Sequence, residues 1–308
     1  MRRLEGPYHQ SEINDYLACP QALLLKLQGV EPLFRSMSQC RGAAVHAAIH
    51  RLHNEQDWDL WQQVFDEAWC QEFNHPGPPI NATPDKIEQE YEDWSTAIGN
   101  YASREQHSPL IHSELQVRGV VTSRSGRRYA IEGTVDQVRR CQDGKGYEIY
   151  ELKTNATLPG QASLERNIQL CLYCWCCVAG DVLVDEEWIS ARQALPGVLR
   201  NCACYKLSNL IPYKRSGRRP DGVKYNAGDL RGEPVVTVPV RPEQLVEGVQ
   251  GIARIIAAIR AGGFFWNPSS LYGGCDACPY KYACGTAFTS NREVSPMPLP
   301  EGIAVKTA

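Results

Sequence analysis

The sequence predicts an α+β protein in which a central mixed β-sheet is flanked by helices. Two observations favour this class. Apolar residues recur every three or four positions over the first hundred residues, as in helices, and they alternate with polar residues between Leu115 and Thr154, as in strands. The chain has 308 residues, of which 43% are hydrophobic, so it can enclose a sizeable core.

The N-terminal third is predicted to be helical. The helical spacing is clearest in three segments, residues 11–27, 42–52 and 59–69. A loop rich in Pro and Asn interrupts the pattern at residues 74–84, and a further helix is expected over residues 85–106. We therefore predict a helical N-terminal region over residues 1–110.

The middle of the chain, residues 111–240, is predicted to form the core with the sheet. Three segments are rich in β-branched and aromatic residues and are separated by the turn sequences SRSGR and QDGKG, which predicts a three-stranded antiparallel meander over residues 115–123, 127–140 and 146–154. A helix over residues 161–179 should follow. Strand-like segments come next, at residues 182–191, 203–210 and 234–240.

The C-terminal part is predicted to contain a helix, a cysteine segment and a tail. Pro242 and the GGF sequence at residues 262–264 mark the start and the end of a helix over residues 241–261. This helix and the cysteines form a unit over residues 241–289. Residues 290–308 hold several prolines and no periodicity, so we expect a disordered tail.

The charge and the cysteine count narrow the class of protein. The 32 basic and 35 acidic side chains give a net charge of -3, so a nucleic acid would need a local basic patch. The sequence shows neither a signal peptide nor a membrane-spanning segment, which predicts a cytoplasmic protein without a membrane partner. Thirteen cysteines, an odd number, favour reduced thiols, some of them metal ligands.

An acidic pair with a lysine is the first candidate site. Side chains alternate along a strand, so Glu151 and Lys153 share one face, and a turn at Asp143 and Gly144 would place Asp136 opposite Glu151. Facing carboxylates repel by up to about 1 kcal/mol unless a cation lies between them, which predicts a Mg²⁺ or Mn²⁺ site. The alternative is a surface salt bridge between Lys153 and Glu151, with Asp136 solvated.

Four short motifs follow one another in the chain. They are G-x-x-x-H at Gly42 to His46, G-x-x-D at Gly133 to Asp136, E-x-K at Glu151 to Lys153, and Q-x-x-x-Y at Gln169 to Tyr173. In this order they resemble the PD-(D/E)XK nuclease superfamily, in particular its RecB-like branch. The resemblance implies a restriction-endonuclease-like fold and a metal-dependent DNA nuclease, a phosphodiester hydrolase.

The resemblance also implies roles for the site residues. His46, Asp136, Glu151 and the backbone carbonyl of Leu152 would be ligands of Mg²⁺ or Mn²⁺, and Lys153 would be catalytic together with the three ligand side chains. The number of ions, one or two, stays open. These roles make the acidic pair and its lysine the centre of the predicted active site.

Three further residues match positions of the same family. Gln169 and Tyr173 are four residues apart, so they share a helix face, and they would position the DNA backbone or the lysine. Glu114 matches an acidic position found in this branch.

His46, His50 and His53 share one face of a predicted helix, and such a trio is a possible zinc site. Only His46 carries the preceding Gly42 of the motif, so we interpret the other two as bystanders.

The cysteines near the C-terminus form the second candidate site. Cys275, Cys278 and Cys284 have C-x2-C-x5-C spacing and need a fourth ligand, for which Cys19 is the candidate. This layout resembles the iron-sulfur RecB-like nucleases, which include the AddB nuclease domain and the CRISPR-associated RecB-like exonucleases. The resemblance implies a 4Fe-4S cluster as a C-terminal clamp, and zinc is the alternative. The remaining cysteines are expected to pack in the core.

A basic loop is the candidate DNA contact. Its cations could bind phosphates and its two tyrosines, Tyr213 and Tyr225, could stack on bases, although a solubilising loop would have the same composition. The cations are Lys214, Arg215, Arg218, Arg219 and Lys224.

Together these features predict an exonuclease that acts on single-stranded DNA or DNA ends in repair, recombination or CRISPR adaptation. The alternative from another class is a DNA-binding iron-sulfur subunit of a larger DNA-processing complex. A third interpretation is a zinc-dependent regulatory protein. The chain has no Walker A motif, so any unwinding would need a helicase partner.

Overall fold

The structure, a computed structural model, describes residues 6–154, 161–265, 275 and 278–284. Its centre is an eight-stranded mixed sheet with the order β10-β7-β4-β3-β2-β5-β6, and β1 pairs with β3 outside this path. The predicted α+β class with a mixed sheet is confirmed. The strands of this sheet are β1 (Tyr8–His9), β2 (Leu110–Thr122), β3 (Arg128–Arg140), β4 (Gly146–Lys153), β5 (Asp181–Val184), β6 (Glu187–Ser190), β7 (Val198–Lys206) and β10 (Val235–Pro239).

The predicted antiparallel meander is β2-β3-β4, and its register determines the site. Gln137 pairs with Tyr150 and Val138 with Ile149, which is the predicted register. The loop between β3 and β4 is longer than the predicted two-residue turn, because β3 ends at Arg140 and β4 begins at Gly146. Within it Gly144 has a φ of 69° and the Asp143 carboxylate accepts the Lys145 N–H at 2.9 Å. β4 continues into the sheet through parallel pairing with β7.

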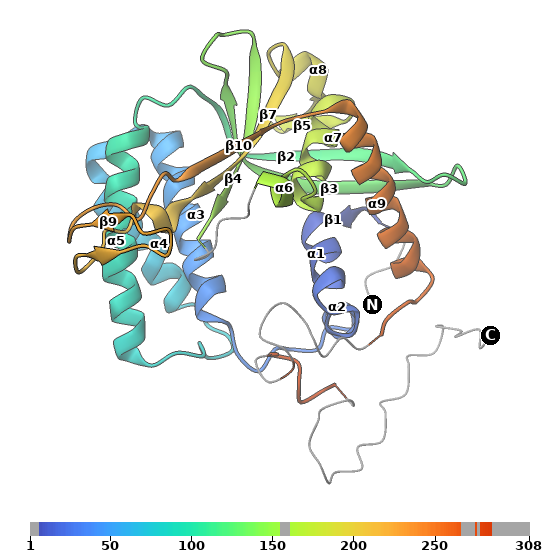
Figure 1. The fold of residues 1–308 in the computed structure, drawn as a ribbon. Helices are drawn as coiled ribbons and strands as arrows, with labels where there is room; N and C mark the ends of the chain where they lie inside the picture. The colour runs from blue at the N-terminus through green and yellow to red at the C-terminus, as the bar shows by residue number, and fades with distance from the viewer. Residues whose placement is uncertain (1–5, 155–160, 266–274, 276–277, 285–308) are drawn as a thin grey trace.

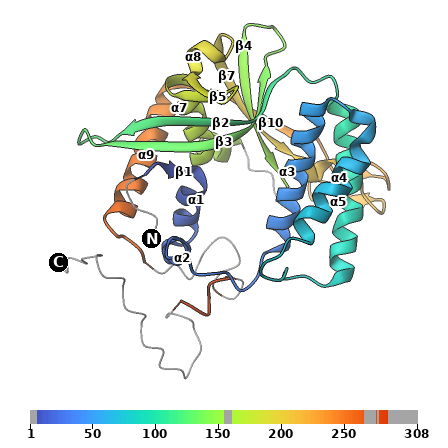
Figure 2. The ribbon, with the colours of Figure 1, turned by 180° about the vertical axis from the view of Figure 1, so that it is seen from behind.

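Two groups of helices pack on the sheet, as Figures 1 and 2 show from opposite sides. One group consists of α3 (Met37–Glu55), α4 (Trp61–Phe73) and α5 (Pro84–Glu105), and the other of α1 (Gln10–Ala18), α7 (Ile168–Ala179) and α9 (Pro242–Arg260). Each group has its own apolar core. Leu152 and Tyr205 belong to the first core, and Ile149 belongs to the second.

Short elements complete the described fold. The predicted helix over residues 161–179 is interrupted, because the Asn167 side chain accepts the Leu170 N–H at 3.0 Å and starts a new helix there. A small two-stranded sheet forms in the basic loop. The short elements are α2 (Pro20–Leu27), η1 (Trp58–Leu60), α6 (Gln161–Leu164), α8 (Ala191–Ala194), η2 (Leu207–Leu210), β8 (Gly217–Arg218) and β9 (Lys224–Tyr225).

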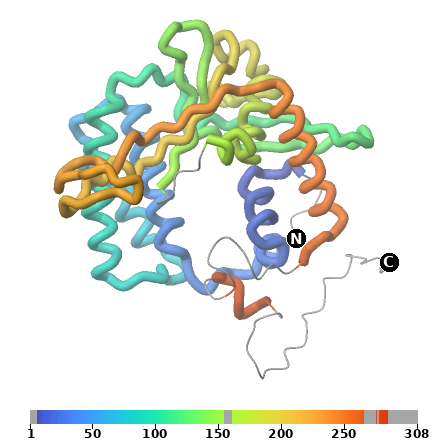
Figure 3. Tube along the Cα trace, in the orientation of Figure 1, coloured from blue at the N-terminus to red at the C-terminus, as the bar shows by residue number. Residues whose placement is uncertain are grey.

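The cysteine segment returns to the N-terminal part of the chain. The Leu33 N–H donates to the Pro279 carbonyl at 2.9 Å, and the Tyr282 hydroxyl donates to the Glu31 carbonyl. In Figure 3 this segment lies below α2.

The predicted disordered tail, residues 290–308, falls outside the described residues, and the predicted division at residues 110, 240 and 289 stays a prediction. Within the described residues no helix is both long and apolar enough to cross a bilayer.

Candidate metal centre

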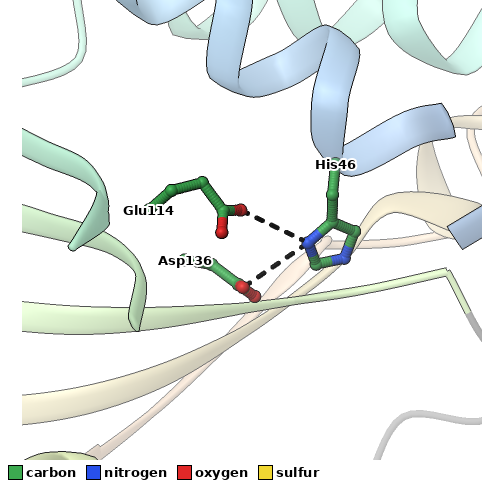
Figure 4. Close-up of side chains that lie close together, drawn as sticks. All are labelled: His46, Glu114 and Asp136. Atoms are coloured by element: carbon green, nitrogen blue, oxygen red, sulfur yellow. Dashed lines mark ion pairs between the residues drawn. The ribbon is translucent and has the colours of Figure 1, made fainter. Parts of the chain in front are cut away.

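His46, Glu114 and Asp136 converge at one point from α3, β2 and β3 (Figure 4). The Nδ1 atom of His46 lies 3.4 Å from Asp136 Oδ1 and 3.7 Å from Glu114 Oε1. One ligand atom from each residue lies within 4.8 Å of the other two, and no other such trio of ligand side chains occurs in the described residues. We call these three residues, together with Glu151 and Lys153, the acidic site.

Local backbone structure brings the first three residues together. A capping box of Ser36 and Gln39 fixes the start of α3, so His46 lies in the third turn of a well-anchored helix. Glu114 has a φ of 54°, which is rare for a residue other than glycine. Backbone strain of this kind persists where the surroundings impose it, and here it occurs at the residue whose carboxylate approaches His46.

Glu151 lies beside Asp136, because the next pair along the observed register of β3 and β4 would join these two residues. The Leu152 N–H donates to Asp136 Oδ2 at 2.6 Å, so Leu152 contributes to the site through its backbone. A contact of its carbonyl with a metal stays a prediction. Glu151 is 4% exposed, and its Oε2 atom is buried without a hydrogen-bond partner. Burial, and secondly the charge of Asp136, raise the pKa of Glu151.

Lys153 is held by two acceptors. Its Nζ atom donates to Glu151 Oε1 at 2.5 Å and to Gln169 Oε1 at 3.2 Å. The amide nitrogen of Gln169 donates to the same Glu151 oxygen at 2.7 Å and to the Tyr173 hydroxyl at 3.0 Å. Burial would lower the pKa of Lys153, but Glu151 outweighs burial and raises it, so the side chain stays an ammonium ion.

The glycine of the G-x-x-D motif makes room for Tyr173. A Cβ atom at Gly133 would lie 2.8 Å from the Tyr173 ring, which is too close for any side chain. The Tyr173 ring packs against β3 as a result, and its hydroxyl reaches Gln169. The G-x-x-D and Q-x-x-x-Y motifs are thus parts of one packing arrangement.

With its three carboxylates ionised, the acidic site holds more negative than positive charge. The positive groups are the Lys153 ammonium and, when it is protonated, the His46 imidazole. Burial would lower the pKa of His46, but the charges and hydrogen bonds of Asp136 and Glu114 raise it. Imidazole and carboxylate oxygen are both established ligands of divalent metals, and a metal that binds here must displace the His46 proton. The donor set and the orphaned Glu151 oxygen fit such an ion.

A cavity of about 1070 Å³ lies next to the acidic site. Lys153 and Gln169 line one part of it, and Cys19, Cys278 and Tyr280 line another. The acidic site and the cysteines predicted to hold a cluster therefore border the same cavity.

The other two histidines of α3 do not join the trio. His50 Nδ1 lies 3.0 Å from Ser113 Oγ, and His53 Nε2 lies 2.8 Å from the Tyr101 hydroxyl. His53 is buried, and burial and the charge of Arg139 lower its pKa to about 3. A zinc site on the three histidines has no support in this geometry.

The four predicted cluster cysteines approach one another. Cys19 lies between α1 and α2. Burial, and then the nearby thiols of Cys19, Cys284 and Cys275, raise the pKa of Cys278. No three of their sulfur atoms lie within 4.8 Å of one another. Four thiolates on one zinc ion would be closer, because a Zn–S distance of about 2.3 Å separates tetrahedral ligands by only about 3.8 Å.

The basic loop lies on the outer side of the group of helices α3, α4 and α5, next to α5 in Figure 1. Its Lys214 forms an ion pair with Asp93 of α5 at 2.7 Å. Tyr213 and Tyr225 stack on each other with ring centroids 3.7 Å apart, and the guanidinium of Arg219 lies 6.0 Å from the Tyr213 ring. The aromatic faces predicted to stack on bases are thus partly used within the loop.

The sequence analysis did not identify Gln10, a polar residue next to the acidic site. Its Oε1 atom accepts a hydrogen bond from the Tyr173 hydroxyl at 3.4 Å. A glutamine at the start of a predicted helix carries no local signal of such a contact.

Comparison with known proteins agrees with this arrangement. The family model described as "PD-(D/E)XK nuclease superfamily" matches residues 9–285. A search of curated proteins gives no match. A solved structure described as "Crystal structure of SSO0001" is similar at 12% identity and a TM-score of 0.32, over 91% of this chain and 95% of that one. A TM-score this low carries no argument about fold or function.

Proposed function

Because the chain belongs to the PD-(D/E)XK nuclease superfamily, we propose that it is a Mg²⁺- or Mn²⁺-dependent deoxyribonuclease, an exonuclease acting on single-stranded DNA or DNA ends. The observation that supports this most is the buried Glu151 oxygen without a partner, beside the carboxylate of Asp136. A divalent cation is the ligand that satisfies such an oxygen and offsets the repulsion between the two acids.

The metal ligands that we propose are His46, Glu114 and Asp136, whose ligand atoms lie together, and Glu151, which lies beside Asp136 outside that trio. The Leu152 carbonyl is a further donor in this proposal. A cation bound there supplies Lewis-acid polarisation of the scissile phosphate and lowers the pKa of an attacking water molecule. The buried position of the carboxylates limits competition from water, which strengthens their hold on a cation.

Lys153 is the residue that we propose to stabilise the negative charge that develops on the phosphate. Its ammonium is directed by Glu151 and Gln169, so it needs little reorganisation during the reaction. Gln169 is in turn directed by Tyr173. These two residues therefore act as positioning residues for the lysine.

A cleavage assay with labelled oligonucleotides tests the proposal. With Mg²⁺ or Mn²⁺, the wild-type protein should digest linear single strands and leave circular ones intact, and 5′ and 3′ labels give the direction. Lys153→Ala should lose cleavage and keep its fold by circular dichroism. Lys145→Ala, which changes an exposed lysine in the loop between β3 and β4, is the matched control. Unchanged cleavage in Lys153→Ala would contradict the assignment.

We further propose that Cys19, Cys275, Cys278 and Cys284 bind a 4Fe-4S cluster. Burial, and then the thiols of Cys19, Cys284 and Cys275, raise the pKa of Cys278, so these thiols lie near it. Three closely spaced cysteines with a distant fourth fit the ligand set of such a cluster. The cluster would join Cys19 to the C-terminal segment and so close a loop of more than 250 residues, which stabilises the fold by restricting the unfolded chain.

Anaerobic purification tests the cluster. The protein should be brown and contain iron and sulfide, and Cys278→Ala should lose colour and solubility. Cys70→Ala, at an exposed cysteine of α4, should keep both. Colourless protein with stoichiometric zinc would reject the cluster.

The pathway that we propose is DNA repair, recombination or CRISPR adaptation, with a helicase or another DNA-processing protein as partner. The basic loop at residues 213–225 is the surface that we assign to DNA or to such a partner, because its Arg218 and Lys224 are exposed. A pull-down of DNA that compares the variant Arg218→Ala/Lys224→Ala with the wild type distinguishes these two roles. Weaker DNA retention by the variant assigns the loop to DNA, and equal retention assigns it to a protein partner.

A further inference from the structure

Gln10 is a buried polar residue next to the acidic site. It lies in the first turn of α1, is 7% exposed and contacts Tyr173. Its backbone is well fixed, because β1 pairs with β3 immediately before it and a capping box starts α1. A Cβ atom at Gly133 would lie 3.3 Å from the Gln10 Cβ, so β3 allows this close approach.

A chain of hydrogen bonds determines the orientation of the Gln10 amide. The Lys153 ammonium can only donate, so the Gln169 oxygen faces it and the Gln169 nitrogen faces Glu151 and Tyr173. The Tyr173 oxygen accepts from Gln169, and its own O–H therefore donates to Gln10 Oε1. The Gln10 nitrogen consequently points away from Tyr173.

The Gln10 nitrogen has no hydrogen-bond partner in the described residues. Buried donors are normally paired, so an unpaired one suggests a partner that is absent from the protein itself. Gln10 lines the same cavity as Lys153 and Gln169. The non-bridging oxygens of a phosphodiester are acceptors only, and they suit a donor NH2 group.

We propose that Gln10 binds the nucleic-acid strand, an inference that rests on the proposed nuclease function. Its NH2 group donates to a backbone phosphate oxygen of a strand in the cavity, while its Oε1 atom holds the Tyr173 hydroxyl. The contact is made to the backbone and reads no base. Because it forms in the bound state and in the transition state alike, its loss raises KM and leaves kcat within about threefold.

Two substitutions distinguish the donor role of the Gln10 nitrogen from the acceptor role of its oxygen. Gln10→Glu keeps the acceptor for Tyr173, removes the donor and adds a negative charge, so KM should rise more than about tenfold. Gln10→Met removes both polar ends without adding charge, and KM should rise about tenfold. The matched control is Asn14→Asp, which adds the same charge one turn further along α1 at the same cavity and should change KM less than about threefold.

Binding measurements in EDTA test the contact independently of cleavage. Single-stranded oligonucleotides with one neutral methylphosphonate are scanned by fluorescence anisotropy. At one linkage the wild type should lose about tenfold in affinity, and Gln10→Met should show no further loss at that linkage.

The outcomes are distinct. Equal KM increases in Gln10→Glu and Asn14→Asp, or additive losses in the methylphosphonate scan, would overturn the assignment of Gln10. Absence of cleavage in the wild type would overturn the nuclease function instead, whereas the anisotropy scan still reports on Gln10. If Gln10→Met does not fold, Gln10→Glu with its control gives the result.

Discussion

Strand β3 contributes residues to two polar clusters that differ in the balance of their charges. The acidic site includes Asp136 of this strand, and the adjacent residues Gln137 and Arg139 belong to a second cluster, which we call the closed network. Helix α3 contributes a histidine to each, His46 to the first and His53 to the second. The members of the closed network are His53, Tyr101, Glu105, Gln137, Arg139 and Tyr205.

The closed network satisfies its charges internally. Arg139 Nη1 donates to Glu105 Oε2 at 2.6 Å, and the Tyr205 hydroxyl donates to the other Glu105 oxygen at 2.9 Å. Gln137 accepts from the Arg139 guanidinium at 2.9 Å and donates to Tyr101 at 2.7 Å. One positive and one negative charge are thus buried together with their hydrogen-bond partners.

The acidic site holds an excess of carboxylates and an oxygen without a partner. Glu151 and Glu105 are buried alike, at 4% and 7% exposed, so burial of a carboxylate alone does not mark a functional site, whereas His46, Glu114 and Lys153 keep the acidic site partly open. The difference teaches that a cluster with excess carboxylates favours a bound cation, whereas a balanced buried cluster is costly to break at one partner.

The largest expected effect is the loss of cleavage activity in Glu151→Gln. Glu151→Gln removes a proposed metal ligand and should lower the rate of cleavage by about 10⁴-fold. The melting temperature should change little, because the lost repulsion with Asp136 offsets the lost charge opposite Lys153. Single-turnover kinetics and calorimetry measure the two effects. A Glu151→Gln protein that cleaves at the wild-type rate would remove the distinction between the clusters.

The next effect concerns stability. Glu105→Gln leaves Arg139 as an uncompensated buried charge, so the free energy of unfolding should fall by about 3–5 kcal/mol. Urea titration followed by circular dichroism measures it. Glu233→Gln, which changes the exposed partner of Arg104, should cost less than about 1 kcal/mol. Similar losses in both variants would show that the network is not closed.

A smaller effect is expected from the metal itself. Mg²⁺ or Mn²⁺ at about one hundred times its Kd should raise the free energy of unfolding by about 2.7 kcal/mol, because the ion binds only the folded state. Asp136→Asn should lose this gain, and Glu105→Gln should keep it. Thermal unfolding with and without the ion provides the measurement, and an ion effect that survives in Asp136→Asn would place the ion elsewhere.

The smallest effect is a pH dependence in the closed network. The pKa of His53 is about 3 in the fold and 6.5 in a free side chain. Between these values the unfolded state binds more protons at this residue, so the contribution of His53 to stability is lost as the pH falls below 6.5, by at most about 1.4 kcal/mol per pH unit. His53→Gln can keep a bond to Tyr101 and should flatten this slope. Urea titrations of the wild type and of His53→Gln from pH 8 to pH 5 measure the pH dependence of the free energy of unfolding. An equal slope in both proteins would contradict the lowered pKa of His53.

Much of the acidic site could be predicted because its spacing is local. Asp136 and Glu151 lie on adjacent strands joined by a short loop, so the turn sequence gave their register even though the loop is longer than a two-residue turn. Gln169 and Tyr173 are one helical turn apart and share a face for the same reason. The interruption before α7 was not predicted, because an asparagine that follows Glu165 and Arg166 can equally lie on the exposed face of a continuous helix.

Contacts between distant segments could not be predicted. Glu114 has a positive φ inside β2, and no sequence pattern encodes it. The closed network joins α5, β3 and β7, whose residues are far apart in the chain. The parallel pairing of β4 with β7 also needs a crossover that periodicity does not specify.

The amino-acid sequence by itself determined the α+β class, the motif residues of the acidic site and the spacing of the cysteines, because side-chain periodicity and short turns act over a few residues. The tertiary structure alone decided which charges are balanced. In the sequence only the motif glycine Gly42 distinguishes His46 from His53, and packing places one against two carboxylates and the other against Tyr101. Charge balance is a property of neighbours in space, and the fold chooses those neighbours.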